Sequence, residues 1–446
     1  MTTGVREPNP EKARDNSQPA HPVRRTGTDA FERNGRPSGS PVALERRLMR
    51  YLLEKLGGPP IKIQFWDGTE VAASKSSETI GALKIRDRQT LWRLAIDPAF
   101  QIGESYANGT LEVEGDLLGL LQAVHRTQQS PDGVQLDTGT LASRFRRRIH
   151  NSPERSRENI HQHYDIGNDF YRLWLDAEMA YTCAYFKNPD VSLEQAQFDK
   201  FDHVCRKLQL EPGQTVVEAG CGWGGFALHM AREYGVVVRA YNISQEQVAF
   251  ARRRACEAGL EDRVEFVLDD WRDISGRYDA FVSVGMLEHI GIKNYRLLGD
   301  VIQRSLVPSG RGLIHSIGTN RPRPMNVWIE RRIFPGAQPP SLGQMMNIFE
   351  GNDFAIQDVE NLRLHYALTL KHWWERFEQS ADTVREMFDE RFVRMWRLYL
   401  ASSTSAFESG WLQLFQVSFT HDSNNNLACT REHLYADQRP ETFPPL

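Results

Sequence analysis

Five short apolar runs recur along the second half of the chain, and a longer stretch of mixed character separates each from the next. They cover residues 215–218, 236–240, 264–267, 279–284 and 312–315. Strands that are apolar on both faces are typical of a parallel sheet covered by helices on either side. The pattern therefore predicts an α/β fold with a Rossmann-like doubly wound sheet, whose ligands bind at the carboxyl ends of the strands.

A second, smaller pattern precedes this one. From Val42 to Leu56 apolar residues recur mostly every three or four positions, and a Gly-Gly-Pro-Pro sequence ends this predicted helix. Residues 61–65 alternate between apolar and polar, an Asp-Gly turn signal follows, and residues 83–85 form a further candidate strand. The segment 42–130 is therefore predicted to be a small α/β accessory domain.

The remaining segments have no such periodicity. Residues 1–41 are rich in Pro, Arg, Asn, Gly and Ser, so we expect a disordered tail. Residues 131–157 read as a basic linker, whose run 144–150 either contacts anionic headgroups or is simply solvated. The catalytic domain is expected to occupy 158–430, with late amphipathic helices that pack in its core.

Composition narrows the classes of protein. At 446 residues the chain has room for two or three domains, and 40% hydrophobic with 25% charged residues is typical of a globular protein. A net charge of -4 argues against nucleic acid as a partner. No secretory signal or apolar run of membrane-spanning length is seen, so contact with lipid is expected from the water side. The scattered cysteines signal neither disulfides nor zinc, so a cytoplasmic location is expected; they are Cys183, Cys205, Cys221, Cys256 and Cys429.

A glycine-rich turn follows the first strand of the predicted sheet. Gly220, Gly222 and Gly224 alternate there, and a helix begins near Phe226. Such a turn lets the backbone approach a ligand, and the helix terminus offers free N–H groups, so a nucleotide-like cofactor is predicted. Because dinucleotide enzymes space their glycines differently, the turn instead resembles the first motif of class I methyltransferases, which lines the methionine part of S-adenosylmethionine.

The next two strand ends carry further candidates. The second strand ends in Asn242 and Ile243 where an acidic residue is usual, but an asparagine can still bind ribose hydroxyls. After the third strand, Asp270 could accept from the adenine amine and Trp271 could cover the ring. Each has an ordinary alternative, since Asp270 fits a helix cap and Trp271 a core aromatic.

Six ordered blocks between Glu158 and Thr420 resemble the cyclopropane-fatty-acyl-phospholipid synthase and mycolic acid methyltransferase family. The blocks are 159–171, 181–186, 220–225, 285–291, 333–336 and 365–370. Residues 103–117 are also similar to the accessory domain of some bacterial lipid methyltransferases. The neutral Asn242 followed by Gln247 matches this family. The resemblance implies cofactor contacts from Tyr181, Thr182, Glu218, Gly220, Cys221, Gly222, Asn242, Ile243, Gln247, Asp270 and Trp271.

The resemblance also implies a bicarbonate site at Cys183, Glu288, His315, Tyr366 and the backbone of Ile317. An alkene is a poor nucleophile, and its attack on a sulfonium methyl leaves a carbocation from which a base must remove a proton. A small anion held by His315 and Tyr366 and oriented by Glu288 meets that need. Taken singly, Cys183 fits a small buried hydrophobe and Tyr366 a packing residue. Taken together, Glu288 and His315 at strand ends favour the functional interpretation.

The expected activity is therefore methylene transfer from S-adenosylmethionine to a cis double bond of an unsaturated phospholipid. Retention of His315 favours ring closure over a methylene or methyl branch. Many family members have a cysteine in a late Tyr-Leu-x-x-Cys stretch. This chain has Tyr399-Leu400-Ala401-Ser402-Ser403 there, so no thiol is available, and no catalytic role is given to Ser403. A small-molecule methyltransferase is the alternative, and a scaffold with a retired catalytic domain ranks last because the glycines and Glu288 are retained.

Three expectations concern the surroundings of the enzyme. Residues 322–346 are expected to fold over the sheet edge and build an acyl tunnel. The substrate is expected at the membrane surface, with the enzyme bound peripherally to the inner face. A homodimer is expected only because symmetric dimers are the commonest oligomers.

Overall fold

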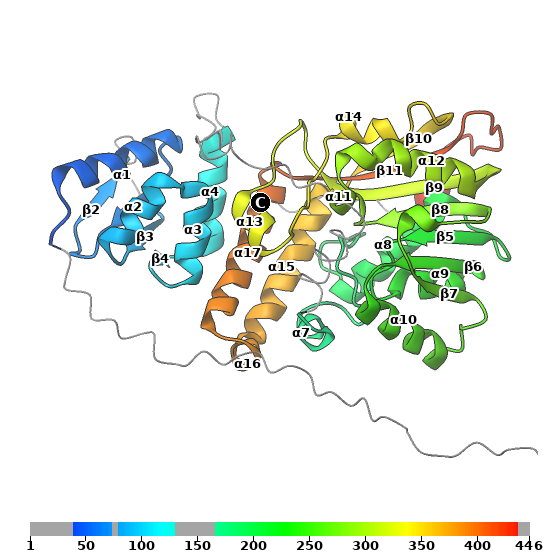
Figure 1. Ribbon diagram of the computed structural model, residues 1–446, viewed down its shortest axis with the longest axis horizontal. Helices are drawn as coiled ribbons and strands as arrows, with labels where there is room; N and C mark the ends of the chain where they lie inside the picture. Colours follow the sequence, from blue (N-terminus) through cyan, green and yellow to red (C-terminus); the bar gives the residue numbers. More distant parts are fainter. Residues whose placement is uncertain (1–38, 74–78, 130–165, 436–446) are drawn as a thin grey trace, which may run out of the picture. The chain divides into compact units, whose positions relative to one another are not determined.

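The computed structural model describes residues 39–73, 79–129 and 166–435. The expected tail up to residue 38, the basic run 144–150 and most of the block 159–171 lie outside the described residues. A seven-stranded sheet with the order β10-β11-β9-β8-β5-β6-β7 forms the centre of the catalytic domain (Figure 1). Its strands are β5 Thr215–Ala219, β6 Val237–Asn242, β7 Val264–Leu268, β8 Tyr278–Val284, β9 Leu306–Gly318, β10 Phe354–Asn361 and β11 Gln413–His421.

The five predicted strands are confirmed as β5 to β9, and their neighbours pair in parallel. The sequence did not predict β10 and β11, which add an antiparallel edge beside β9. Consecutive residues of β5 belong to different cores: Val216 packs with helices α8, α9 and α10, and Val217 packs with α12. The sheet is therefore covered on both faces, as the apolar pattern predicted.

Helices surround this sheet. Those before and within the strand series are α7 Asn168–Arg172, α8 Leu193–Leu208, α9 Gly225–Tyr234, α10 Gln245–Glu257, α11 Leu287–Ile290 and α12 Tyr295–Ser305, with short 3-10 turns at Trp271–Asp273, Ile292–Asn294 and Met346–Ile348. Those after β9 are α13 Val327–Arg332, α14 Leu342–Met345, α15 Arg363–Gln379, α16 Ala381–Met387, α17 Glu390–Glu408 and α18 Glu432–Tyr435. None of the helices in the described part of the chain is both long and apolar enough to cross a bilayer.

An aromatic core joins α7, α15 and α17. Trp174, Trp373 and Trp396 are fully buried in it, and the Trp174 ring centroid lies 5.6 Å from that of Trp373 and 5.8 Å from that of Trp396. This confirms that the late amphipathic segments are core helices. Burial of three large indole rings makes this layer a substantial apolar contribution to stability.

The accessory domain contains a second sheet, with the order β2-β1-β3-β4. Its strands are β1 Ile61–Gln64, β2 Glu70–Ala72, β3 Gly81–Ile85 and β4 Leu111–Glu114, and its helices are α1 Ala43–Lys55, α2 Arg88–Ile96, α3 Pro98–Ala107 and α4 Leu117–Gln129. The predicted helix and both predicted strands are present as α1, β1 and β3. Buried Met49 and Leu53 hold α1 on this sheet.

Candidate active site

Two cavities meet at the carboxyl ends of the central strands. The smaller, of ≈ 120 Å³, is lined by the glycine-rich turn between β5 and α9, the end of β6 and the loop after β8. The larger, of ≈ 330 Å³, extends from there between α15, α17, α13 and the accessory domain. Both are lined by Tyr181, Thr182, Gly285 and His289, so these residues stand where a cofactor and a substrate would meet.

The backbone of the smaller cavity requires glycine at two positions. Gly222 has φ +53°, and a Cβ atom there would point into space that no other atom occupies within 4 Å. Gly285 has φ +75°, and its Cβ would lie 2.9 Å from Thr182 Cγ2. A side chain at either residue would thus be strained and would also narrow the place that a ligand would take.

A buried carboxyl group stands in the smaller cavity. One oxygen of Glu218, Oε2, is buried and has no hydrogen-bond partner. Burial raises the pKa of Glu218 to about 8 although Lys200 opposes this shift, and burial lowers the pKa of Lys200 to about 8. Lys200 itself donates to Thr182 Oγ1 at 2.9 Å. The free acceptor of Glu218 fits a cationic cofactor such as S-adenosylmethionine, because a positive group would favour the ionised carboxylate.

The predicted pair after β6 stabilises the turn. Asn242 Nδ2 donates to Gln247 Oε1 at 2.8 Å and to the carbonyl of Gly222 at 3.1 Å. Both side chains also line the smaller cavity, as do Tyr181, Thr182, Glu218, Gly220, Cys221 and Gly222. The structure therefore brings together eight of the eleven residues expected at the cofactor.

The other three predicted cofactor residues do not line this cavity. Asp270 is buried and forms an ion pair with Arg272 at 2.9 Å, and Trp271 packs in the core beside α12. Ile243 likewise is absent from the lining residues. Their contacts to the adenosine half of a cofactor remain predictions.

The five residues expected at the anion site all line the larger cavity: Cys183, Glu288, His315, Ile317 and Tyr366. They come from separated parts of the chain, since Glu288 follows β8, His315 and Ile317 belong to β9, and Tyr366 to α15. The backbone N–H of Ile317 donates to Glu288 Oε1, so the carboxyl group is fixed against β9. Cys183 is completely buried, and burial raises the pKa of its thiol.

Two buried polar atoms at this site have no hydrogen-bond partner: Glu288 Oε2 and His315 Nε2. Burial raises the pKa of Glu288 to about 7 and lowers the pKa of His315 well below its usual value. Near neutral pH the imidazole is therefore uncharged. An uncompensated polar atom costs free energy in an apolar interior, so the pair fits a small ligand that both donates and accepts hydrogen bonds.

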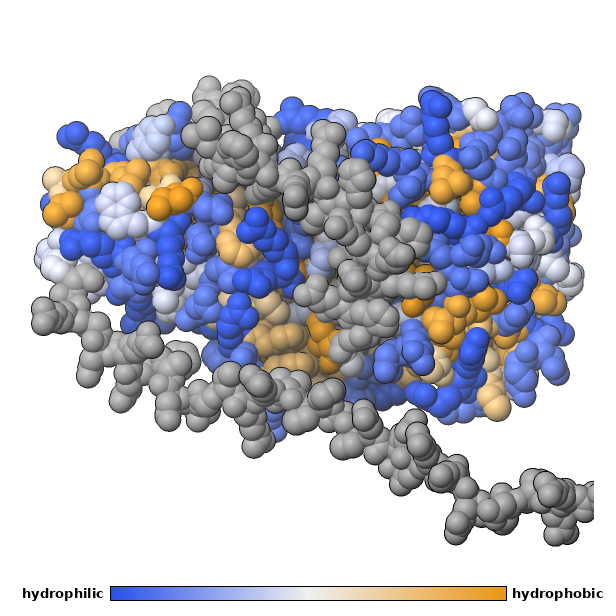
Figure 2. Space-filling model, viewed as in Figure 1, coloured by the Kyte–Doolittle hydropathy of each residue, from blue (hydrophilic) through white to orange (hydrophobic). Residues whose placement is uncertain are grey.

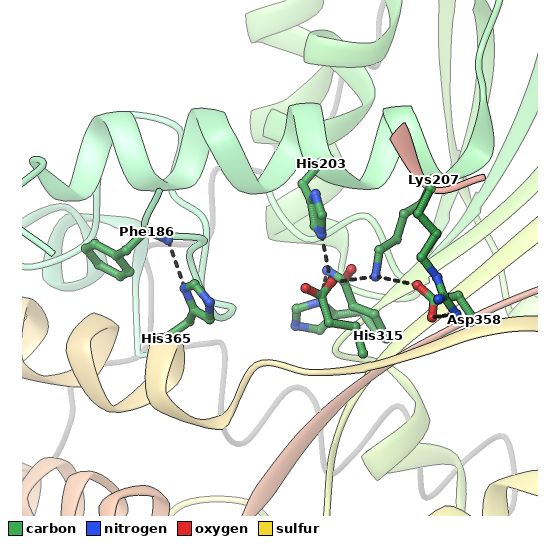
Figure 3. Close-up of polar contacts among 9 residues, drawn as sticks. Phe186, His203, Lys207, His315, Asp358 and His365 are labelled. Atoms are coloured by element: carbon green, nitrogen blue, oxygen red, sulfur yellow. Dashed lines mark hydrogen bonds and ion pairs between the residues drawn. The ribbon is translucent and has the colours of Figure 1, made fainter. Parts of the chain in front are cut away.

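A polar network lies behind His315, as Figure 3 shows. Gln416 Nε2 lies 3.1 Å from His315 Nδ1, and Gln416 is also the strand partner of Glu360. Glu360 Oε2 is 2.7 Å from His203 Nε2 and 2.6 Å from Lys207 Nζ, both on α8. Burial opposes ionisation of Glu360, but these hydrogen bonds outweigh it and lower its pKa to about 2. The network therefore ties α8 to β10, the neighbour of the strand β11 whose Gln416 contacts His315 on β9.

Several site residues were missed by the sequence analysis. Gly285, Met286 and His289 line the smaller cavity, and a signal existed because they belong to the block 285–291. Lys200 and Gln416 had no such signal. Tyr399, from α17, places its hydroxyl 2.8 Å from the Tyr181 hydroxyl, and Ser403 lines the larger cavity.

The accessory domain contributes to the larger cavity through α3 and α4. Trp328 of α13 packs directly on Gly103, where a Cβ would lie 2.4 Å from the indole, and Trp328 Nε1 donates to Glu104 at 3.1 Å. His125 Nδ1 lies 2.7 Å from Ser405 Oγ of α17. Residues of the segment 322–346 also line this cavity, as the tunnel prediction requires.

Family models match two parts of the chain. The model described as mycolic acid cyclopropane synthetase matches residues 151–417, and one of a domain of unknown function matches residues 48–132. The chain is 37% identical over 387 residues to a probable fatty acid methyltransferase of Pseudomonas putida, covering 84% of this chain and 96% of that protein. It is 42% identical over 272 residues to the cyclopropane-fatty-acyl-phospholipid synthase of Escherichia coli K12, covering 60% and 69%.

Solved structures of the same family are similar to this chain in fold. The cyclopropane synthase MmaA2 of Mycobacterium tuberculosis is 29% identical, with a TM-score of 0.57 over 59% of this chain and 97% of that chain. The mycolic acid cyclopropane synthase CmaA1, solved with SAH and CTAB, is 28% identical, with a TM-score of 0.57 over 61% and 99%. The class I methyltransferase fold, expected from the doubly wound strand pattern together with the resemblance of the glycine-rich turn, is thereby confirmed.

Proposed function

Because this chain belongs to the mycolic acid cyclopropane synthetase family of S-adenosylmethionine-dependent enzymes, we propose that it cyclopropanates unsaturated acyl chains of phospholipids. The methylene group would be added across a cis double bond, and bicarbonate would be the general base. The high identity to the Escherichia coli synthase supports this choice of substrate and product.

One observation carries the proposal. Cys183, Glu288, His315, Ile317 and Tyr366 line one cavity, and that cavity adjoins the glycine-rich one at Tyr181 and Thr182. The unpaired atoms Glu288 Oε2 and His315 Nε2 suit bicarbonate, which can donate from its hydroxyl and accept at its other oxygens. A small-molecule methyltransferase would need no such anion site.

The protein's own groups have distinct roles in this reaction. S-adenosylmethionine supplies an electrophilic methyl group, and bicarbonate a base for the proton that leaves it. Glu288 and His315 hold that base, Tyr366 completes the site, and the aromatic rings of Tyr181 and Phe334 border the place where positive charge develops. Burial of the site excludes water, which would otherwise capture a carbocation.

The larger cavity supports an acyl substrate. Its volume of ≈ 330 Å³ lies within the usual range of ligand sites, and most of its lining residues are apolar, among them Leu121, Ile329, Leu370 and Leu414. An alkyl chain gains about 0.8 kcal/mol for each methylene it buries there. A small polar substrate would gain little from this lining.

Contact with a membrane surface is supported by helix α1. Its exposed residues include Leu44 and Tyr51, with exposed fractions of 65% and 52%, and also Arg47 and Arg50. Apolar residues gather in this part of the surface in Figure 2. A helix face that mixes apolar and basic residues favours binding to anionic lipid from the cytoplasmic side.

The test is mass spectrometry of acyl chains after the purified protein is incubated with S-adenosylmethionine and vesicles of cis-unsaturated phospholipid, with and without bicarbonate. A gain of one methylene unit that resists hydrogenation, and that depends on bicarbonate, is the expected result. A gain of mass that is independent of bicarbonate would contradict the role of the anion. No gain despite cofactor binding would contradict the choice of substrate.

A methyl or methylene branch is the second candidate product. The probable fatty acid methyltransferase of Pseudomonas putida matches this chain over more of its length than the Escherichia coli synthase does, which favours this outcome. Hydrogenation distinguishes the branched products from the ring. It converts a methylene branch to a methyl branch and does not change a methyl branch, whereas the cyclopropane ring persists.

A further inference from the structure

The larger cavity has a closed end and an open rim. At its closed end Cys183, His315 and Leu370 are at most 1% exposed. At its rim Ile102 is 40% exposed, and Asn326 and Pro324 are also exposed. An elongated substrate would therefore place its reacting carbons at the closed end and its polar end at the rim.

Arg323 lies at this rim, and its guanidinium group has no anionic partner among the described residues. It is the only lysine or arginine among the described residues that line the cavity. Its guanidinium carbon lies 4.0 Å from the ring centroid of Trp411, which also lines the cavity. Two of its nitrogens, Nε and Nη1, are enclosed and have no hydrogen-bond partner. The cation–π contact with Trp411 holds the guanidinium over the ring but satisfies neither of these N–H groups.

Among the described residues, no charge compensates that of Arg323. No described carboxylate forms an ion pair with it, and the neighbouring charge is that of Arg321, which is exposed. Burial and this like charge lower the pKa of Arg323. His125, in the same cavity, is neutral because burial lowers its pKa to about 4. Two enclosed N–H donors without an acceptor cost free energy, and a guanidinium binds phosphate oxygens well, so an anion is the ligand that fits this side chain.

We propose that Arg323 binds the phosphate of the lipid headgroup and so positions the acyl chain in the cavity. This inference rests on the proposed function and names the group that recognises the polar end of its substrate. The phosphate lies at one end of a phospholipid acyl chain and the double bond lies within the chain. An anchor at the rim and a reacting centre at the closed end stand in the same order along the cavity.

The first test is kinetic and uses the full-length protein. Vesicles carry the same cis-unsaturated chains on phosphatidylglycerol or, without a phosphate, on diacylglycerol. Arg323→Ala is expected to raise KM for phosphatidylglycerol about tenfold or more, with kcat little changed and with no effect on diacylglycerol. Arg323→Lys, which keeps the charge but loses the planar fork, should be intermediate. Arg321→Ala is the matched control, because Arg321 is exposed and does not line the cavity, and it should leave KM unchanged.

Equal losses on both lipids, or an equal loss in Arg321→Ala, would overturn the proposal, because a fold defect or a diffuse surface charge would then explain the effect. Thermal unfolding of each variant separates the first of these from substrate binding.

A binding measurement keeps this inference distinct from the proposed function. Calorimetric titration with dodecyl phosphate and with dodecanol should show that only the phosphate binds less tightly, about tenfold or more, to Arg323→Ala. If the wild-type protein modifies no lipid but shows this dependence, the proposed function fails and the anion site stands. If the wild-type protein prefers neither ligand, the anion site is excluded even in an active enzyme.

Discussion

The side-chain amide of Gln416 donates to Nδ1 of His315 across 3.1 Å, in the buried space between β11 and β9. An imidazole that accepts at Nδ1 carries its proton on Nε2. The Nε2 atom is buried without a hydrogen-bond partner among the described residues, and His315 lines the larger cavity. Gln416 thus leaves the Nε2–H of His315 as the donor for the anion that we propose at this site.

Gln416→Glu is expected to lower kcat about 10- to 100-fold and to leave KM for S-adenosylmethionine unchanged. A carboxylate at this place would accept a hydrogen bond from Nδ1, and so would favour the tautomer that has its proton on Nδ1 and none on Nε2. Gln416→Leu, which imposes neither tautomer, should lose less. Steady-state kinetics at saturating bicarbonate measures both variants, and an equal loss in the two would indicate a packing role instead.

The buried carboxyl group of Glu288 should make stability depend on pH. Its pKa is raised from 4.5 to about 7, so its stabilising contribution is fully present below pH 4.5 and is lost as pH rises through 7. The shift corresponds to about 3 kcal/mol at high pH. In Glu288→Gln, which cannot ionise at this position, the free energy of unfolding should therefore fall less between pH 4.5 and pH 7 than in the wild-type protein. The variant should also be inactive.

Urea unfolding from pH 5 to pH 9 measures this effect. Glu265→Gln is a suitable control, because that side chain is exposed on β7 and pairs with Arg239 at the surface. A wild-type free energy of unfolding that follows the Glu288→Gln curve at every pH would show that the group titrates normally.

Gly222→Ala is expected to weaken S-adenosylmethionine binding about tenfold, because its Cβ would enter the smaller cavity. Gly259→Ala is the matched control: Gly259 has φ +62°, its Cβ would also meet no atom, and it lies after α10 away from the cavity. Both substitutions should cost about 1 kcal/mol of stability, since both place an alanine in a left-handed backbone conformation that glycine adopts without strain. Calorimetry should show that only Gly222→Ala changes the dissociation constant, and equal affinities would contradict the placement of the cofactor.

Glu104 connects the accessory domain to the catalytic domain. Its carboxylate accepts from Arg332 at 2.7 Å and 2.8 Å and from Trp328 Nε1 at 3.1 Å. Glu104→Ala should cost about 1–3 kcal/mol and raise KM for lipid, because Trp328 is part of the cavity wall.

Glu112→Ala provides the comparison. It removes an exposed ion pair with Arg86 inside the accessory domain, so its effect should stay below about 1 kcal/mol. Thermal unfolding and lipid kinetics of both variants test the difference. A Glu104 variant with wild-type KM would show that the contact between the domains does not shape the cavity.

The central strands and the glycine-rich turn could be predicted because their signal is local. Runs such as 215–218 and 279–284 are apolar on both faces, and a series of such runs separated by helical segments is typical of strands buried between helices. The edge strands escaped prediction for a physical reason. β11 is buried along nearly its whole length, but Gln416 and Ser418 interrupt its apolar run, and exposed residues recur along β10. Polar residues are accepted in β11 because neighbouring strands provide their partners.

The sequence alone therefore determined the class of fold and the position of the glycine-rich turn, and its family motifs supplied the residues that we propose for the anion site, since each depends on residues close together in the chain or on such a motif. Only the tertiary structure decided that Cys183, Glu288 and His315 share one cavity, that Gln416 orients His315, and that Arg323 lies on Trp411 at the rim. These contacts join residues far apart in sequence. Their geometry follows from how helices and strands pack, which no local pattern encodes.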